Sequence, residues 1–236
     1  MNLFYSKNTT INHNEIIIND QENRHLTKVL RKKIGDLIHV TNGEGVLFKC
    51  VIEESNKNKS ILRIHDYSIF NNDFPKLKIG ISLTKKTDRF EWFLEKATEI
   101  GVSEITPIIS ENSERSKFNH ERATKLLLSA MKQSLQYKLP ILNNPISFLD
   151  YISKRDDSYD SYIAICLDDG LDLFNKKLCR GNNSDILIGP EGGFNLSEID
   201  LAKKANFVPV SLGENRLRTE TAGVVVCSIF SNINYI

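Results

Sequence analysis

Residues 185–222 constrain the fold of this chain more than any other stretch. They hold two apolar, strand-like runs, and each run ends in a glycine-bearing turn that is followed by a helix-starting sequence. The first turn reads Gly-Pro-Glu-Gly-Gly over 189–193, and the second begins at Ser211 and passes through Gly213. Ligands of open α/β sheets collect at the carboxyl ends of strands. The two turns are therefore predicted to form two walls of one pocket.

Strand-like runs alternate with longer helical patterns from Lys78 onward, which predicts βα units and a parallel sheet. Strands are expected at 78–83, 104–109, 161–167, 185–188 and 207–212, and helices beginning near Asp88, Asn119, Asn195 and Thr219. The last helix is apolar over most of its circumference. Such a helix is expected to be buried or to lie in a subunit interface.

The first 70 residues instead carry several short β-rich runs, which favour a small barrel. The runs are 15–19, 37–41, 46–52 and 60–64, with a glycine hairpin turn at 42–45 and a helical interruption at 20–33 whose N-cap would be Asp20. Residues 71–75 are polar and contain a proline, so they are the predicted linker.

The helical interruption is strongly basic. Five cations fall within ten residues without an acid among them, namely Arg24, Lys28, Arg31, Lys32 and Lys33. One interpretation is a solvated helix face whose basic end complements the helix dipole. The other is contact with RNA phosphates. The pattern alone leaves both open.

Composition limits the class of protein. With 40% hydrophobic and 26% charged residues, the chain is typical of a globular protein, and no apolar run approaches the length of a membrane span. The N-terminus lacks the layout of a secretion signal. The four cysteines form no C-x-x-C pair, and three of them lie in apolar runs where burial is expected: Cys50, Cys166 and Cys227. These features predict a cytoplasmic protein with no membrane contact and no metal.

The two turns exclude several kinds of site. Neither a Walker-type phosphate loop nor G-x-G-x-x-G is present, and Glu191 would repel a phosphate. No G-x-S-x-G elbow occurs, and no histidine lies near the turns. Glycine lets backbone groups approach an adenine edge directly. A nucleoside ligand without phosphates therefore fits best.

The second turn leads into a helix start with unusual charges. Thr219 or Thr221 can cap that helix, and Glu220 suits its dipole. Arg216 and Arg218 are unfavourable there, because the N-terminal end of a helix already carries positive charge. Arginines placed against this preference indicate a binding site.

At this point a family resemblance becomes visible. Ile-Gly-Pro-Glu-Gly-Gly-Phe at 188–194, with Leu-Gly at 212–213 and Leu-Arg-Thr-Glu-Thr-Ala at 217–222, resembles the RsmE family of 16S ribosomal RNA methyltransferases in the SPOUT superfamily. Four upstream stretches are similar to family signatures: 25–31, 95–102, 114–116 and 133–134.

The resemblance implies a PUA-like RNA-binding barrel at 1–72 and an α/β domain with a trefoil knot at 76–236. It implies a homodimer that uses S-adenosylmethionine to methylate N3 of one uridine in the 16S rRNA of the small ribosomal subunit. Two departures are Gln136, where the family often has arginine, and the order Asn-Arg-Leu-Arg at 215–218.

The resemblance and the chemistry of the reaction together predict which residues contact each reactant. For catalysis, the chemistry of methyl transfer points to Arg218, which would stabilise the uridine anion, and to Glu220, the nearby titratable group able to accept the N3 proton, although the role of Glu220 as a helix-start carboxylate is favoured over that one. Cofactor contacts are expected from Leu167, Ile188, Gly189, Pro190, Glu191, Gly192, Gly193, Leu212, Gly213, Leu217, Thr219, Thr221 and Ala222. RNA contacts are expected from Arg24, His25, Lys28, Arg31, Lys32, Lys96, Arg115 and Arg216.

Two alternatives remain open from the sequence. One is a non-catalytic RNA-binding or ribosome-assembly protein that kept the fold, against which the intact loop motifs argue. The other is a methyltransferase that acts on a different RNA. Cofactor titration separates the first from the leading hypothesis, and mapping of the modified nucleotide separates the second.

Overall fold

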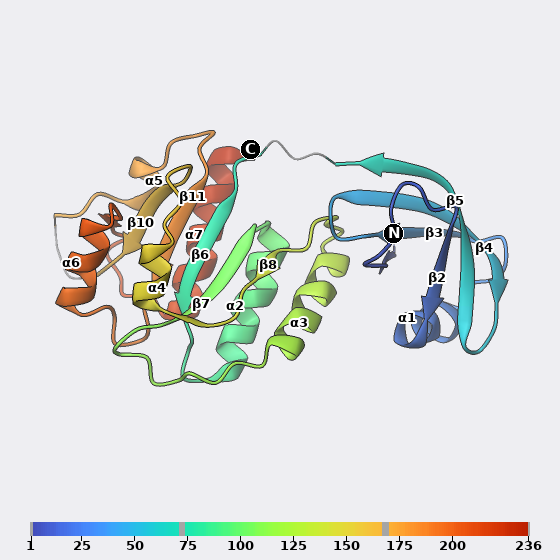
Figure 1. Cartoon of the computed structure of the whole chain (residues 1–236), viewed down its shortest axis with the longest axis horizontal. Coiled ribbons are helices and arrows are strands. Elements are labelled where there is room, and N and C mark those ends of the chain that lie inside the picture. Colours follow the sequence, from blue (N-terminus) through green and yellow to red (C-terminus); the bar gives the residue numbers. More distant parts are fainter. Residues whose placement is uncertain (1, 71–73, 167–169, 236) are drawn as a thin grey trace. The chain divides into compact units, whose positions relative to one another are not determined.

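The computed structural model describes residues 2–70, 74–166 and 170–235. They form two compact units, both drawn in Figure 1. One unit holds the described residues up to 70 together with Leu128–Leu139, and the other holds Phe74–Leu127 with the described residues from Pro140 onward. Residues 71–73 of the predicted linker lie outside the described residues. The domain ranges 1–72 and 76–236 stay a prediction.

The first unit is built on a five-stranded sheet with the order β1-β3-β4-β5-β2. Its strands are β1 (Leu3–Tyr5), β2 (Glu15–Asn19), β3 (Leu37–Thr41), β4 (Val46–Ser55) and β5 (Lys59–Ile69). Pairing along β3, β4, β5 and β2 is antiparallel, whereas β1 pairs with β3 in parallel. The four predicted strands are confirmed. Strand β1 was not predicted, because three residues are too few to show an alternation.

The turn between β3 and β4 is the predicted hairpin. Gly43 and Gly45 have φ angles of 76° and 95°, in the region that glycine occupies without a steric cost. Asn42 Oδ1 accepts hydrogen bonds from the backbone N–H groups of Glu44 at 2.9 Å and Val46 at 3.2 Å. The turn therefore fixes the register of β3 (Leu37–Thr41) against β4 (Val46–Ser55).

The basic segment at 20–33 is helical over less of its length than predicted. Helix α1 (Asp20–Arg24) passes into a π-helical turn η1 (His25–Val29). It stops there because Arg31 has a φ of 52°, which a right-handed helix does not allow. The predicted N-cap is wrong: Asn19 occupies that position, without a side-chain cap bond, and Asp20 lies inside the helix with a φ of 48°.

Within the first unit, Leu128–Leu139 contacts the N-terminal residues through both polar and aromatic groups. Thr41 Oγ1 donates a hydrogen bond to the carbonyl of Tyr137 at 3.1 Å, and the rings of Phe70 and Tyr137 lie 4.5 Å apart. Lys132 forms an ion pair with Glu22 of α1. Sequence patterning does not predict these contacts, because they join residues that lie between 67 and 110 positions apart.

The second unit is built on a seven-stranded sheet. The order is β12-β10-β11-β6-β7-β8, with β9 also paired to β7, and every pairing between its described strands is parallel. The strands are β6 (Leu77–Ser82), β7 (Glu104–Ile109), β8 (Ile141–Leu142), β9 (Ile146–Ser147), β10 (Asp160–Ala164), β11 (Ser184–Ile188) and β12 (Val208–Val210). The predicted parallel α/β architecture is confirmed. Strands β8 and β9 were not predicted, since two residues carry no periodicity.

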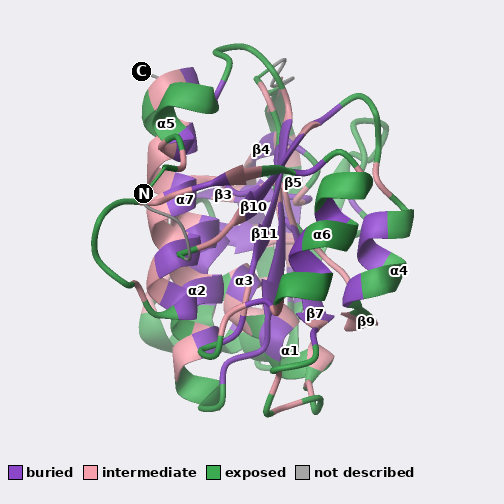
Figure 2. Cartoon of the chain, turned by 90° about the vertical axis from the view of Figure 1, so that its left-hand side faces the viewer, coloured by how far each residue is buried: buried purple, intermediate pink, exposed green. Residues whose placement is uncertain are grey.

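Helices cover both faces of this sheet. The helices that lie wholly in this unit are α2 (Thr87–Ile100), α4 (Phe148–Ser153), α5 (Phe174–Lys177), α6 (Leu196–Lys204) and α7 (Thr219–Asn234). Helix α3 (His120–Gln133) begins in this unit, and its residues from Leu128 onward belong to the first. Figure 2 shows buried strands with α2 and α7 on one side and α4 and α6 on the other. The capping box predicted at Asn195 and Glu198 is confirmed at the start of α6. Helices α4 and α5 were not predicted, because neither is long enough to display a helical repeat.

Helix α7 packs unusually closely against α2. A Cβ at Gly223 would lie 2.4 Å from Cε2 of Phe93, a distance that real Cβ atoms do not adopt. Glycine therefore sets the separation of the two helices. From β12 at one edge of the sheet, α7 returns to contact β6 and β11 near its middle. The passage of this helix through a loop, which the trefoil knot requires, stays a prediction.

Three general features complete the fold. No helix in the described part of the chain is long and apolar enough to cross a membrane. The described residues contain no group of three or more His, Cys, Asp or Glu side chains able to hold a metal ion. All four cysteines are free, and Cys50 and Cys227 are buried as expected. The expectation is wrong for Cys166, which is exposed because β10 ends at Ala164 and Cys166 lies beyond it.

Candidate functional site

The two glycine-bearing turns lie at the carboxyl ends of β11 and β12 and line one pocket, as predicted. The pocket is bounded by Ala164, Ile165, Cys166, Ile188, Gly189, Pro190, Glu191, Gly192, Gly193, Phe194, Leu212, Gly213, Asn215, Arg216, Leu217, Thr219 and Ala222. Three strand ends and the first turn of α7 thus contribute to it. Strands β10, β11 and β12 deliver their carboxyl ends to the same edge because all three run in parallel.

Hydrogen bonds hold the two turns in place. Thr219 Oγ1, at the start of α7, donates to the carbonyl of Gly189 at 2.9 Å and ties the second turn to the first. Within the first turn, the N–H of Gly193 donates to the carbonyl of Pro190 at 2.9 Å. Asn112 Nδ2 donates to the carbonyl of Gly193 at 3.0 Å from outside. These bonds order the pocket walls without occupying the interior.

Glu191 connects the pocket to the segment that follows β6. Its Oε1 accepts a hydrogen bond from the backbone N–H of Lys85 at 3.1 Å, while the side chain stays exposed and lines the pocket. A carboxylate at this position can accept hydrogen bonds from hydroxyl or ammonium groups of a ligand. It opposes the binding of an anion.

The walls are mostly apolar side chains and bare backbone. Ile188, Leu212, Leu217 and Ala222 supply apolar contact, and among the described lining residues Arg216 is the one that carries a positive charge. This combination suits a nucleoside base and ribose better than a phosphate chain. The enclosed volume is about 110 Å³. Pockets for drug-sized ligands start at roughly 300 Å³, so a nucleoside has to extend into the open mouth of the pocket.

Most of the predicted cofactor residues are brought together here. Eleven line the pocket: Ile188, Gly189, Pro190, Glu191, Gly192, Gly193, Leu212, Gly213, Leu217, Thr219 and Ala222. Leu167 lies outside the described residues. Thr221 is half-buried in α7 and is not among the lining residues. The assignment of these residues to a cofactor stays a prediction.

The prediction did not include one wall. Ala164 is the last residue of β10, Ile165 and Cys166 follow it, and Phe194 and Asn215 extend the two turns. The wall after β10 could have been predicted, because β10 is a parallel neighbour of β11 and therefore ends at the same edge of the sheet. The predicted strand ran to 167, however, which hid the point where the chain leaves the sheet.

Arg218 and Glu220 lie beside the pocket in different environments. Arg218 is the N-cap residue of α7 and is exposed, and its side chain makes no hydrogen bond or ion pair within the described part of the chain. The Glu220 side chain is 7% exposed, with Oε1 3.6 Å from Nε of Arg89 on α2. Its Oε2 is buried, with no hydrogen-bond partner among the described residues. Arg218 is therefore accessible to a ligand, whereas Glu220 is enclosed.

The predicted RNA contacts fall on both units. In the first unit, Arg24, His25, Lys28 and Arg31 are exposed and Lys32 is half-buried. In the second unit, Lys96 Nζ donates to Glu95 at 2.8 Å and to Glu99 at 2.9 Å, so its charge is already compensated. Arg216 lines the pocket.

Arg115 lies in a wide basic groove of the second unit. The groove is lined by Lys85, Lys86, Thr87, Asp88, Glu91, Arg115, Asn119 and Arg122 and measures about 670 Å³. Arg115 Nε donates to the carbonyl of Lys117 at 2.8 Å. Because Lys85 also donates to Glu191, the groove adjoins the first turn of the pocket. The predictions missed Lys85, Lys86 and Arg122, since isolated basic residues carry no spacing signal.

Two family models match the chain. An RNA methyltransferase domain matches residues 72–231, and an RNA methyltransferase PUA domain matches residues 18–64. The first alone covers more than half of the chain.

Several known proteins are similar to this chain over nearly its full length. The ribosomal RNA small subunit methyltransferase E of Mesomycoplasma hyopneumoniae is 31% identical, with 94% of this chain and 91% of that protein aligned. A crystal structure of a probable rRNA-methyltransferase from Porphyromonas gingivalis matches with a TM-score of 0.91 at 35% identity, covering 100% and 99% of the two chains. A ribosomal RNA small subunit methyltransferase E from Neisseria gonorrhoeae, bound to S-adenosyl methionine, has the same fold, with a TM-score of 0.89 at 24% identity, and the match covers 99% and 98% of the two chains.

Proposed function

Because the chain belongs to the RNA methyltransferase family that includes the ribosomal RNA small subunit methyltransferases E, we propose that it methylates N3 of a specific uridine in 16S rRNA. The methyl donor is S-adenosylmethionine, and the product is N3-methyluridine. The observation that carries the proposal is the single pocket formed by both glycine-bearing turns at the carboxyl edge of the parallel sheet.

The residues of the pocket fit the cofactor. When bound, S-adenosylmethionine supplies a methyl group on a positively charged sulfonium. The apolar walls and the exposed backbone of the first turn receive the adenosine, and Glu191 offers an acceptor for ribose hydroxyls or for the ammonium group. The absence of a basic cluster among the described lining residues matches a cofactor that carries no phosphate.

Arg218 is proposed to act on the uridine. N3 lies on the pairing edge of the base and carries a proton, so the base has to be unpaired or turned out of its stack. Loss of that proton places negative charge on O2 and O4. The guanidinium of Arg218 is exposed and unpaired within the described residues, so it can donate to these oxygens as charge develops. Methyl transfer then depends mainly on alignment of the two reactants.

Glu220 remains the predicted proton acceptor, but its surroundings favour another role. A carboxylate that is 7% exposed and faces Arg89 cannot reach a base at the pocket mouth without a rearrangement. In this position it fixes the first turn of α7 against α2 and offsets the positive end of the helix dipole. We therefore assign to Glu220 the positioning of the helix start, and to Arg218 the contact with the base.

RNA binding is proposed for both units. The range 1–72 is taken as a PUA-like RNA-binding domain whose exposed cations Arg24, Lys28 and Arg31 contact phosphates. The range 76–236 is taken as the knotted methyltransferase domain, in which Arg115 and the basic groove guide the strand toward the pocket. The small ribosomal subunit is the expected partner, and the cytoplasm is the expected compartment.

A homodimer is proposed through the face of α2 and α7. Trp92 of α2 is 44% exposed. Along α7, Val224, Val225, Ile229 and Ile233 are only half-buried. Apolar side chains left partly open on two adjacent helices favour a subunit interface.

Mapping of the modified nucleotide tests the function. Small subunits from a strain lacking the gene would be incubated with the protein and S-adenosylmethionine, and the rRNA digested for mass spectrometry. One N3-methyluridine in 16S rRNA is expected, and a reverse-transcription stop should locate it, because the methyl group blocks the pairing edge. Methylation of another base, or none with cofactor bound, would overturn the proposal.

A further inference from the structure

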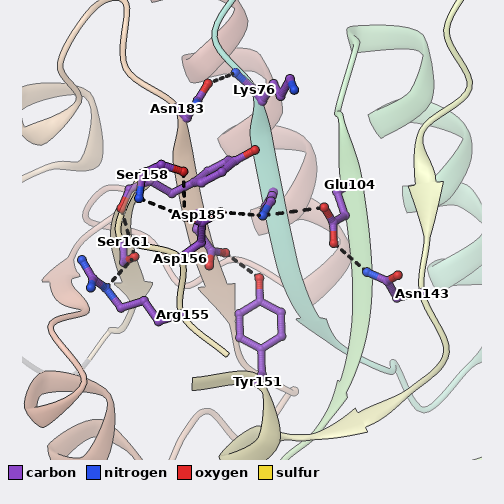
Figure 3. Close-up of polar contacts among 12 residues, drawn as sticks. Lys76, Glu104, Asn143, Tyr151, Arg155, Asp156, Ser158, Ser161, Asn183 and Asp185 are labelled. Carbon is purple, nitrogen blue, oxygen red and sulfur yellow. Dashed lines mark hydrogen bonds and ion pairs between the residues drawn. The ribbon is translucent and has the colours of Figure 1, made fainter. Parts of the chain in front are cut away.

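A second cavity lies at the opposite edge of the same sheet from the cofactor pocket. It measures about 340 Å³ and is lined by Lys78, Glu104, Thr106, Asn143, Asn144, Ile146, Tyr151, Lys154, Asp156 and Asp185. These residues come from the amino ends of β6, β7 and β11, from α4, and from the connections beside them. We call it the acidic cavity; Figure 3 shows its polar contacts.

The sheet register places three charges side by side in this cavity. Asp185 on β11 is the cross-strand partner of Lys78 on β6, and Lys78 is the partner of Glu104 on β7. All three lie at the start of their strands. The row Asp185–Lys78–Glu104 therefore follows directly from parallel pairing and spans the cavity.

Asp185 is the most enclosed member of the row. The residue is 6% exposed, and its Oδ1 accepts a hydrogen bond of 2.5 Å from the hydroxyl of Tyr151. Its Oδ2 has no hydrogen-bond partner within the described part of the chain, although the residue lines the cavity. Tyr151 reaches this position only because Gly80 has no side chain: a Cβ there would lie 2.6 Å from Cζ of the ring. A buried carboxylate is thus held with one oxygen committed and the other open to a ligand.

Lys78 does not satisfy the remaining carboxylates at hydrogen-bond distance. Its Nζ lies 3.9 Å from Glu104 Oε2 and 3.6 Å from Asp156 Oδ2. The same nitrogen lies 4.0 Å from the centre of the Tyr159 ring. The lysine is therefore held between the two acids and over an aromatic face, which leaves Asp185 Oδ2 free of it.

The amide groups add further acceptors. Asn143 Nδ2 donates to Glu104 Oε1 at 2.7 Å and to Thr106 Oγ1 at 2.8 Å, which turns the amide oxygen of Asn143 away from these two bonds. Neither that oxygen nor the Asn144 side chain has a hydrogen-bond partner among the described residues. The cavity therefore holds three acceptor oxygens without a hydrogen-bond partner among the described residues, one each from Asp185, Asn143 and Asn144, beside one apolar wall at Ile146.

We propose that the acidic cavity binds a small aliphatic ammonium ion, with the ammonium group on Asp185 Oδ2 and the alkyl chain against Ile146. A primary ammonium supplies three N–H donors and one positive charge, which match a free carboxylate oxygen and nearby amide oxygens. Three carboxylates against the two cations Lys78 and Lys154 leave room for one more positive charge. The site lies apart from the cofactor pocket and does not depend on the proposed methyl transfer.

The test is a titration of the full-length, isotope-labelled protein followed by backbone amide NMR. Three probes of similar size separate charge from hydrogen bonding: n-butylammonium, tetramethylammonium and n-butanol. We expect saturable shifts at Thr106, Asn143, Asn144 and Asp185 with n-butylammonium only. Equal shifts with tetramethylammonium would mean nonspecific attraction to acidic groups, and no shifts at these amides would mean that no such site exists. Either result overturns the proposal.

Variants assign the site to its carboxylate. Asp185→Asn is expected to weaken n-butylammonium binding about tenfold or more, because it removes a charge-assisted hydrogen bond. Glu104→Gln keeps the contact with Asn143 and is expected to weaken binding less. Asp200→Asn changes an exposed aspartate on α6 and is the matched control. Unchanged affinity in both Asp185→Asn and Glu104→Gln would refute the assignment even if an amine binds elsewhere.

Discussion

Asp185 provides the strongest test of the energetics of this fold. Burial raises the pKa of its carboxyl from 3.8 to about 6, against the opposing effects of the Tyr151 hydrogen bond and the Lys78 charge. Glu104 adds to the rise, and Arg155 counteracts it. The native state therefore keeps a proton that the unfolded chain loses between about pH 3.8 and 6.

The sign and size of the effect on stability follow from that difference. While the unfolded chain is ionised and the native state is not, stability falls as pH rises, by about 1.4 kcal/mol per pH unit. Over the full interval, from 3.8 to about 6, the loss approaches about 3 kcal/mol. Asparagine cannot titrate, and its side-chain oxygen still accepts from Tyr151. The Asp185→Asn variant should therefore gain about 2 kcal/mol relative to the wild type between pH 4.5 and pH 7.5.

Urea unfolding at the two pH values measures this gain. Far-UV circular dichroism and the fluorescence of Trp92 should give coincident transitions, which a two-state analysis needs. The Asp200→Asn variant serves as the matched control, because it removes an exposed carboxylate instead of a buried one. If the difference between Asp185→Asn and wild type changed by less than about 0.5 kcal/mol, the burial of an ionisable carboxyl would not limit stability.

Three further predictions concern the site and the fold. Arg218→Ala is expected to abolish methylation while calorimetry still detects S-adenosylmethionine binding, because Arg218 does not line the pocket; wild-type turnover would contradict its role. Gly223→Val is expected to lower stability by at least about 1–3 kcal/mol, since its side chain would enter the space of Phe93; an unchanged melting temperature would contradict the close packing. Arg24→Ala with Lys28→Ala is expected to leave stability within about 0.5 kcal/mol of wild type and to weaken rRNA binding with a shallower salt dependence, measured by filter binding at several salt concentrations. If the salt dependence of rRNA binding were unaltered, the first unit would not contact RNA phosphates through these two residues.

The sequence predicted the parts of the fold that have a local signal. Alternation located the strands of the antiparallel sheet, and the change to alternating strand and helix patterns predicted the parallel sheet. The capping box at Asn195 and Glu198 located the start of α6 because both partners of the motif lie within four residues. What it could not predict was set by tertiary contacts. Leu128–Leu139 joins the first unit through Tyr137, and nothing near Tyr137 in the sequence indicates Thr41 or Phe70 as its neighbours.

The sequence predicts the site at the carboxyl edge of the parallel sheet but not the cavity at its amino edge. At the carboxyl edge, the glycine-bearing turns are recognisable in the sequence. Because parallel strands end at the same edge of a sheet, the two turns are predicted to lie close together. At the amino edge, Lys78, Glu104 and Asp185 each look like an ordinary charged residue at the start of a strand. Only the register shows that they form one row. To find the acidic cavity from the sequence, both the strand order β11-β6-β7 and its register would have been needed.

The start of α7 explains why two opposite charges two residues apart have different roles. The positive end of the helix dipole stabilises Glu220, and Arg89 on α2 compensates its charge from the other side. Neither effect stabilises Arg218: its positive charge lies at the positive end of the same helix dipole, and its side chain has no charged partner among the described residues. A guanidinium in this position interacts unfavourably with the helix dipole and lowers the stability of the free protein. This loss of stability is offset only when an anion binds beside Arg218. The developing uridine anion is such a partner, and the enclosed Glu220 keeps the helix start rigid while it forms.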